Sequence, residues 1–188
     1  MAEMSDRAIM TRVREGCEAS LGMLLQRHWS GLTAYASRLV HDREDAKDVV
    51  QEVFARVWLK RTDWEPCGSV SGYLYRITRN LSLNWRRSER VRSRAESRGG
   101  LQLLESGKVS DPLEQLEAHR LRREVEAAIE QLPDRRREVF VLSRFHGLTH
   151  REIGEALGIS VPTVSNQMSA ALAQLALLLS HHLNVDQQ

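Results

Sequence analysis

Apolar residues recur every three or four positions along almost the whole of this 188-residue chain. The spacing runs through 11–40 and 72–92, and the segment 44–60 adds an amphipathic face of four valines with Phe54 and Trp58. Few windows alternate apolar and polar residues, and no β-branched run is bounded by an Asn-Gly or Asp-Gly turn. The pattern therefore predicts an all-α fold.

The composition changes between positions 93 and 110, which are rich in Ser, Gly and Arg and contain Gly99-Gly100 and Ser106-Gly107. Such a stretch is typical of a flexible interdomain linker. A helix start follows, with Asp111 as the N-cap and Pro112 at the first helical position. We therefore expect two small helical domains, 1–92 and 111–188, joined by a linker over 93–110.

The positive charge of the chain is concentrated in one segment. Residues 73–98 carry eight Arg against two Glu, a net charge of +6, so the remaining residues carry −4 of the total of +2. This asymmetry favours a polyanionic partner for that segment alone.

Other features exclude several classes of protein. No run of 18 apolar residues is long enough to span a bilayer, and the first 16 residues lack the apolar core of a secretory signal. Cys17 and Cys67 have neither a CxxC partner nor a His at ligand spacing. We expect a cytoplasmic chain with no metal and no cofactor.

Two helix starts separated by a short turn lie between 148 and 175. Thr149 and Glu152 form a capping box, and Gly158 is placed to end that short helix. Ser160 then caps a second helix, with Pro162 in its first turn. A short turn containing Gly between two helices is typical of a helix-turn-helix.

The second helix of this pair has one apolar side and one polar side. The side expected to face a core carries Val164, Met168, Ala171, Leu172 and Leu175. The open side carries Ser165, Asn166, Gln167, Ser169 and Ala170. Asn and Gln can make paired hydrogen bonds to adenine, which favours a recognition helix. The spacing alone fits an ordinary helical hairpin equally well.

Three stretches together resemble the sigma-70 superfamily of RNA polymerase sigma factors. They are 45–54 (DAKDVVQEVF) with Trp58, 73–81 (YLYRITRNL) with 84–87 (NWRR), and 132–142 (LPDRRREVFVL) with 147–153 (GLTHREI). Two sigma regions with a short linker resemble the extracytoplasmic-function (ECF) subfamily. The resemblance implies sigma region 2 in 1–92 and sigma region 4, with its helix-turn-helix, in 111–188.

For region 2, the resemblance implies two surfaces. The acidic helix with a net charge of −3 over 42–52 would dock on the β′ clamp helices of core polymerase, through Asp45, Asp48, Gln51, Glu52 and Phe54. The basic segment would recognise and melt the −10 element and hold its strand, with a flipped base in the loop 61–70. Its candidate residues are Tyr73, Tyr75, Arg76, Arg79, Asn80, Asn84, Trp85, Arg86 and Arg87.

For region 4, the resemblance implies recognition of the −35 element and contact with the β flap. The DNA-binding candidates are His150, Arg151, Thr163, Ser165, Asn166, Gln167 and Ser169. Relatives usually carry Arg or Lys on the exposed side of this helix, and here there is none. Phosphate contacts would then come from Arg135, Arg136, Arg137, Arg144, His150 or Arg151. The pattern around Thr163 and Met168 is similar to the iron-starvation branch.

These expectations define a non-enzymatic sigma subunit that directs promoter-specific initiation. Its partners would be core RNA polymerase, promoter DNA and an anti-sigma factor, often membrane-anchored, with no small-molecule substrate. The alternative is a stand-alone helix-turn-helix regulator that binds duplex DNA as a dimer, for which the apolar 172–183 could serve. An enzyme is disfavoured because no acids, His or nucleophiles converge in the sequence.

Overall fold

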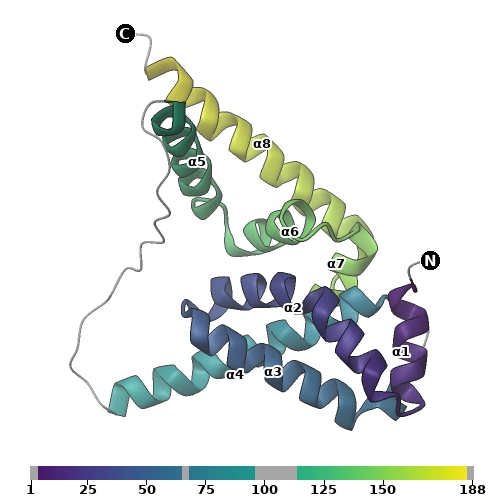
Figure 1. The fold of residues 1–188 in the computed structure, drawn as a ribbon. Helices are drawn as coiled ribbons and strands as arrows, with labels where there is room; N and C mark the ends of the chain where they lie inside the picture. The colour runs from purple at the N-terminus through teal and green to yellow at the C-terminus, as the bar shows by residue number, and fades with distance from the viewer. Residues whose placement is uncertain (1–3, 65–67, 96–113, 186–188) are drawn as a thin grey trace.

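A computed structural model of the chain describes residues 4–64, 68–95 and 114–185 (Figure 1). The elements are α1 (Asp6–Arg14), α2 (Glu18–Val40), α3 (Arg43–Leu59), a 3-10 turn η1 (Arg61–Asp63), α4 (Val70–Ala95), α5 (Glu114–Glu130), α6 (Asp134–Arg144), α7 (His150–Leu157) and α8 (Val161–Val185). No strand occurs within these ranges, and the predicted all-α class is confirmed. Of the expected linker, 93–95 form the end of α4, while 96–110 and the expected cap at Asp111 lie outside the described residues.

Helices α1–α4 form one group. The apolar spacing over 11–40 belongs to two helices, α1 and α2, which are separated at Gly16, whose φ of +89° suits a residue without Cβ. Asp42 begins α3 by accepting from the N–H groups of Glu44 and Asp45, at 2.7 and 3.0 Å. The expected apolar face of α3 is buried through Val49, Val50, Val53 and Val57. These residues fix α3 against the rest of the group.

Helices α5–α8 form the second group, and its local signals act as expected. Thr149 and Glu152 form a capping box, and Gly158 ends α7 with a φ of +66°. The Ser160 hydroxyl accepts from the N–H of Thr163, at 3.3 Å. On α8, Val164, Met168, Ala171 and Leu175 are buried as predicted. Leu172 is 41% exposed, which corrects its assignment to the core: it lies about 100° around the helix from Ala171.

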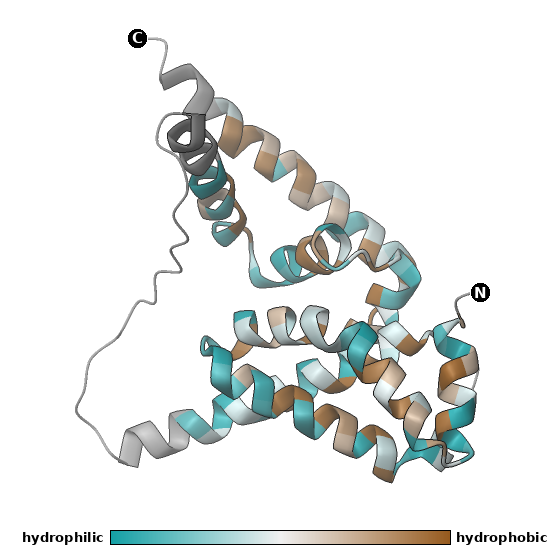
Figure 2. Cartoon of the chain, in the orientation of Figure 1, coloured by the Kyte–Doolittle hydropathy of each residue, from teal (hydrophilic) through white to brown (hydrophobic). Residues whose placement is uncertain are grey.

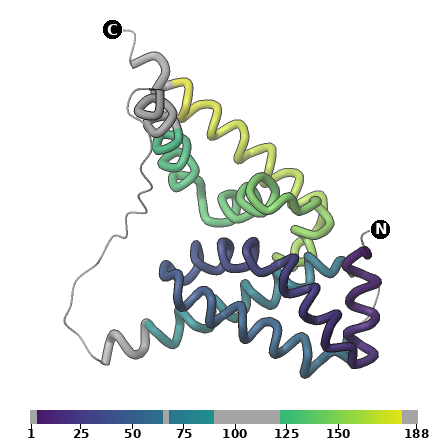
Figure 3. The backbone as a smooth tube through the Cα atoms, in the orientation of Figure 1, coloured from purple at the N-terminus to yellow at the C-terminus, as the bar shows by residue number. Residues whose placement is uncertain are grey.

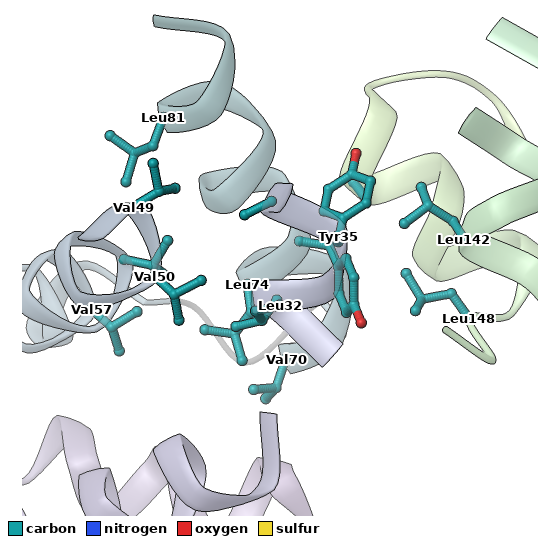
Figure 4. Close-up of a cluster of buried hydrophobic side chains, with 14 of the residues drawn as sticks. Leu32, Tyr35, Val49, Val50, Val57, Val70, Leu74, Leu81, Leu142 and Leu148 are labelled. Carbon is teal, nitrogen blue, oxygen red and sulfur yellow. The ribbon is translucent and has the colours of Figure 1, made fainter. Parts of the chain in front are cut away.

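The two groups pack against each other through α7, which lies on α4 (Figure 3). One apolar cluster extends across both groups. Figure 4 shows Tyr35 of α2 with Leu32 and Leu74 on one side and with Leu142 and Leu148 of the second group on the other. The helix-turn-helix is therefore held beside the basic helix α4.

Helix α8 carries hydrophobic residues along much of its length (Figure 2). Leu172 and Leu177 are exposed there, the latter at 73%. None of the helices in the described ranges combines the length and the apolarity that crossing a membrane requires.

Candidate nucleic-acid interface

The outer face of α4 carries a strip of cationic and amide side chains. Arg76, Asn80, Asn84 and Arg87 are exposed, and their spacing of three or four residues places them on one face. Trp85 and Arg86 are half-buried beside them. Side chains of the predicted basic segment beyond residue 89 lie outside the described part. The strip can bind a phosphate backbone through its guanidinium groups.

A pocket of about 460 Å³ lies at the beginning of this strip. It is lined by Asp63, Trp64, Gly68, Ser69, Tyr73, Arg76 and Glu155. The guanidinium carbon of Arg76 lies 5.7 Å from the ring centre of Tyr73. Burial, the main cause, raises the pKa of Tyr73, so its phenol stays a neutral donor. An aromatic ring, a cation and hydrogen-bonding groups suit an unstacked base.

The pocket coincides with the loop 61–70, where a flipped base was predicted. Residues 65–67 of that loop lie outside the described residues. The structure brings Tyr73 and Arg76 of the predicted strand site together here. Trp64, only 4% exposed, and Ser69 were not singled out from the sequence.

Tyr75 is not on the strand surface, which corrects its predicted contact with DNA in this arrangement. It is 5% exposed, and burial raises its pKa to about 12. Its ring centre lies 5.3 Å from that of Tyr35 and 5.4 Å from that of His146. The second helical group thus covers Tyr75 with His146.

Arg79, another predicted strand contact, is paired with Glu138 of α6. Its Nε and Nη2 donate to the two carboxylate oxygens, at 2.7 and 3.3 Å. Tyr35 donates its hydroxyl to the same carboxylate, at 2.9 Å. Burial alone would lower the pKa of Arg79, but the hydrogen bond and the charge of Glu138 outweigh it and raise that pKa.

Ser69, at the start of α4, receives two carboxylates of α7. Its N–H donates to Glu155 at 2.8 Å, and its hydroxyl donates to Glu152 at 2.7 Å. Burial alone would raise the pKa of Glu152, but hydrogen bonds from Ser69 and Thr149 outweigh it and lower that pKa. Glu152 therefore caps its own helix and binds α4 as an anion.

The predicted polymerase-docking residues lie on α3. Asp48, Gln51 and Glu52 are exposed, and Asp45 is half-buried. Burial, together with the charges of Asp42 and Asp48, raises the pKa of Asp45. Glu52 accepts from Arg56 at 2.7 Å. These four residues present a largely acidic surface.

Phe54 is not part of that surface. It is 3% exposed and belongs to the apolar core with Val50 and Val53. A ring without accessible area cannot contact a partner, so its predicted contact with polymerase is corrected to a packing role.

The predicted reading surface of the helix-turn-helix is accessible. Thr163, Ser165, Asn166 and Ser169 are exposed on α8, and Gln167 is half-buried. The Thr163 hydroxyl also lies 2.8 Å from that of Ser160 and so supports the turn. On α7, His150 is half-buried, and exposed Arg151 lies 3.4 Å from Glu155.

The arginines expected to bind phosphate divide into two kinds. Arg135 and Arg144 are exposed. Arg136 donates to Gln174 of α8 at 3.0 Å. Arg137 donates to the backbone carbonyls of Glu130 and Leu132. Arg136 and Arg137 therefore hold α6 in place, which leaves Arg135 and Arg144 as the freer cations of that set.

Sequence reasoning missed the residues that connect the two groups. Glu138 lies 59 positions from Arg79 and 103 from Tyr35. No local pattern marks a partner so distant in the chain. From the sequence alone, a carboxylate on a helix is expected to face solvent. Only the packing of the two groups shows that it lies between them. In the described ranges no three potential metal ligands gather.

Family models match both helical groups. The model for sigma-70 region 2 matches residues 24–92, and that for sigma-70 region 4 matches residues 122–175. The chain is 33% identical over 162 residues to the ECF RNA polymerase sigma factor SigE of Mycolicibacterium smegmatis. That match covers 85% of this chain and 61% of the relative.

Another relative is similar over nearly its whole length. The RNA polymerase sigma factor CnrH of Cupriavidus metallidurans is 31% identical over 183 residues, covering 94% of this chain and 95% of the relative. The structure of CnrH in complex with the cytosolic domain of CnrY has a TM-score of 0.66 and 26% identity, over 94% of this chain and 97% of that one. The structure of RpoE with the anti-sigma factor NepR from Bartonella quintana shares the fold, with a TM-score of 0.61 and 20% identity, over 85% of this chain and 96% of that one.

Proposed function

This chain belongs to the ECF subfamily of sigma-70 RNA polymerase sigma factors, and we propose that it binds core RNA polymerase and directs initiation at specific promoters. The observation that carries the proposal is the α4 strip with an aromatic, Arg-lined pocket at its start. A duplex-binding repressor has no need of such a surface for a melted strand.

Region 2 docks on polymerase through α3. Asp45, Asp48, Gln51 and Glu52 form the acidic surface, which complements the basic β′ clamp helices. Region 4 contacts the β flap. The two regions correspond to 1–92 and 111–188, with the linker at 93–110.

The α4 strip then holds the −10 strand. Arg76, Arg79, Arg86 and Arg87 neutralise phosphates, while Asn80 and Asn84 donate to base or sugar oxygens. Tyr73 supplies the aromatic face for a base that enters the pocket beside Trp64. Trp85 extends the apolar contact along the strand.

Region 4 reads the −35 element through the exposed residues of α8. Asn166 and Gln167 make paired hydrogen bonds to base edges, with Ser165 and Ser169 as single contacts and Thr163 at the turn. His150, Arg151, Arg135 and Arg144 face the phosphates. Placement in the iron-starvation branch stays a prediction that rests on the pattern of α8 alone.

An anti-sigma factor is the expected regulator. The solved relatives include CnrH with the cytosolic domain of CnrY and RpoE with NepR, which supports a partner of that class for this chain. Because anti-sigma factors of the ECF subfamily are often membrane-anchored, we expect a membrane-anchored regulator for this chain. The chain works in the cytoplasm, beside the polymerase, and it is not itself a catalyst.

Transcription from a genomic promoter library with purified core polymerase tests the proposal. Initiation at defined start sites that requires this chain supports it. Tight duplex binding by the chain alone, with no effect on polymerase, would instead support the stand-alone regulator.

A further inference from the structure

We propose that a pocket between the two helical groups binds a small, neutral, polyhydroxylated molecule of the size of a monosaccharide. The pocket has a volume of about 290 Å³, and the residues that line it differ from those of the pocket beside Tyr73 and Arg76. Its walls come from α2, from the first turns of α4 and α7, and from the turn that joins α6 to α7. The inference concerns a second site and does not depend on the proposed role of α4 in holding DNA.

The phenol of Tyr75 is the observation that points to a ligand. This side chain lines the pocket and is 5% exposed. Its hydroxyl forms no hydrogen bond with any residue that the structure describes, whereas the neighbouring Tyr35 donates its hydroxyl to Glu138 at 2.9 Å. A buried hydroxyl without a partner is destabilising, so a ligand oxygen that accepts from Tyr75 would remove that penalty.

Gly31 of α2 leaves the space that this hydroxyl occupies. A Cβ added at position 31 would lie 2.9 Å from the Tyr75 oxygen, which is too close for either atom to stay in place. Glycine inside a helix is less favourable than alanine, and here its missing side chain keeps the phenol beside the pocket. The wall therefore combines an unpartnered donor with the room that a ligand needs to reach it.

Three more neutral side chains line the pocket without a hydrogen-bond partner. The hydroxyls of Ser30 and Ser71 bond to no other residue in the described ranges. His146 has its Nε2 buried without a partner, and burial, with a smaller contribution from Arg38, lowers its pKa to about 4. Near pH 7 this imidazole is therefore neutral, with one donor and one acceptor. Ligand hydroxyls match such a wall, because each can both donate and accept.

The charged residues of the lining are already engaged within the protein. Arg27 and His28 both contact the carboxylate of Asp6, His28 at 2.6 Å. Glu152 accepts from the Ser69 hydroxyl at 2.7 Å. A charged ligand would have to compete with these contacts, and an anion would also be repelled by Glu152. The pocket therefore favours a neutral molecule.

The volume of the pocket and an aromatic ring in its lining narrow the ligand further. A volume of about 290 Å³ lies just below the range typical of sites for drug-sized ligands, so it suits a single sugar ring. Phe145 is 53% exposed, and its ring offers an apolar face to the C–H groups of such a ring. Because the walls belong to both helical groups, the bound molecule would hold the two groups together.

The test is titration of the full-length chain with D-glucose, with myo-inositol and with the charged D-glucose 6-phosphate. The amide chemical shifts of Gly31, Ser71 and Gly147 in NMR spectra report binding at the pocket. We expect saturable shifts with at least one of the two neutral probes, with a Kd of about 1 mM, and binding about tenfold weaker for the phosphate. If neither neutral probe gives a saturable shift up to about 50 mM, well above that Kd, the pocket holds water only and the inference is overturned.

Variants locate the binding. Tyr75→Phe keeps the ring and removes the hydroxyl, so it should weaken binding about tenfold. Gly31→Ala places a Cβ against the same oxygen and should weaken binding at least as much, and Ser71→Ala replaces it if circular dichroism shows that Gly31→Ala does not fold. Tyr73→Phe is the matched control, because it loses the same group outside this pocket, and it should bind as the parent does.

An affinity that is unchanged in Tyr75→Phe, or reduced equally in Tyr73→Phe, would overturn the assignment of the site. The titration needs neither polymerase nor DNA. Its failure therefore leaves the proposed sigma function standing, and a failure of the transcription assay leaves this pocket standing.

Discussion

Glu138 of α6 and Arg79 of α4 are joined by two hydrogen bonds, although 59 positions separate them in the chain. This pair lies at the junction of regions 2 and 4, and Tyr35 donates to the same carboxylate. The cationic helix proposed to hold promoter DNA is thus engaged by an internal anion.

The junction should contribute measurably to stability. Glu138→Ala removes a charge-assisted acceptor from Arg79 and Tyr35, and we expect the free energy of unfolding to fall by about 1–3 kcal/mol. Urea unfolding followed by circular dichroism measures it. Glu126→Ala, which breaks an exposed pair, should cost less than about 0.5 kcal/mol. Equal losses in the two variants would refute a special role for the junction.

The acidic surface of α3 should govern polymerase affinity. Reversal of charge in Asp48→Arg or Glu52→Arg should weaken capture by core polymerase about tenfold, because close pairing with a basic partner is replaced by repulsion. The thermal midpoint should change little, since both side chains are exposed. Glu15→Arg, at the exposed residue that follows α1, is the control and should retain full capture. Undiminished capture by the α3 variants would show that the interface lies elsewhere.

Promoter preference should depend on α8. Asn166→Ala and Gln167→Ala should each cost about 1–3 kcal/mol at promoters with the preferred base and less at others. Competition between −35 sequences in transcription assays provides the measurement, with exposed Gln131→Ala as the control. An equal loss of transcription at all promoters would show that these residues contribute to DNA affinity in general and not to the recognition of particular bases.

Stability should fall in mild acid because of His146. Burial, with a smaller contribution from Arg38, lowers the pKa of His146 to about 4 from an ordinary 6.5. The unfolded chain therefore takes up a proton below about pH 6.5 that the folded chain accepts only near pH 4, and the free energy of unfolding decreases across that window. Its Nε2 is buried without a hydrogen-bond partner among the described residues.

Urea titrations at a series of pH values measure the slope of the free energy of unfolding against pH. His146→Gln should flatten it between pH 6.5 and 4.5, above the range in which Glu152 begins to contribute. The pKa of Glu152 is lowered in the folded chain, so its contribution to the free energy of unfolding is complete above its ordinary pKa. That contribution is lost as the pH falls through the lowered pKa of the folded chain. A slope that persists in His146→Gln would assign it to another group.

The helix-turn-helix was predictable because its signals are local. Thr149 and Glu152 cap over three residues, and Gly158 ends α7 through its own backbone conformation. The valine face of α3 follows equally from spacing, and it is buried. Both features depend on residues within a single turn or face of one helix, so the sequence alone predicts them.

The rest depended on packing between distant segments. Periodicity placed Phe54 on the apolar face of α3, and the predicted contact with polymerase came from the family resemblance alone. The structure buries Phe54, in agreement with the periodicity. From the sequence, Tyr75 is expected to contact a base. The structure shows instead that the ring of His146, from the second group, packs against it. Gly16 interrupts the first helices although the apolar spacing continues across it. The junction at Glu138 has no counterpart in local sequence.

Run-off transcription with purified core polymerase tests the central claim most directly. We predict discrete transcripts from a subset of genomic promoters that appear only when this chain is added, and that are lost with Asp48→Arg together with Glu52→Arg. Absence of any chain-dependent start site, while the chain alone binds duplex DNA with sequence preference, would contradict the account.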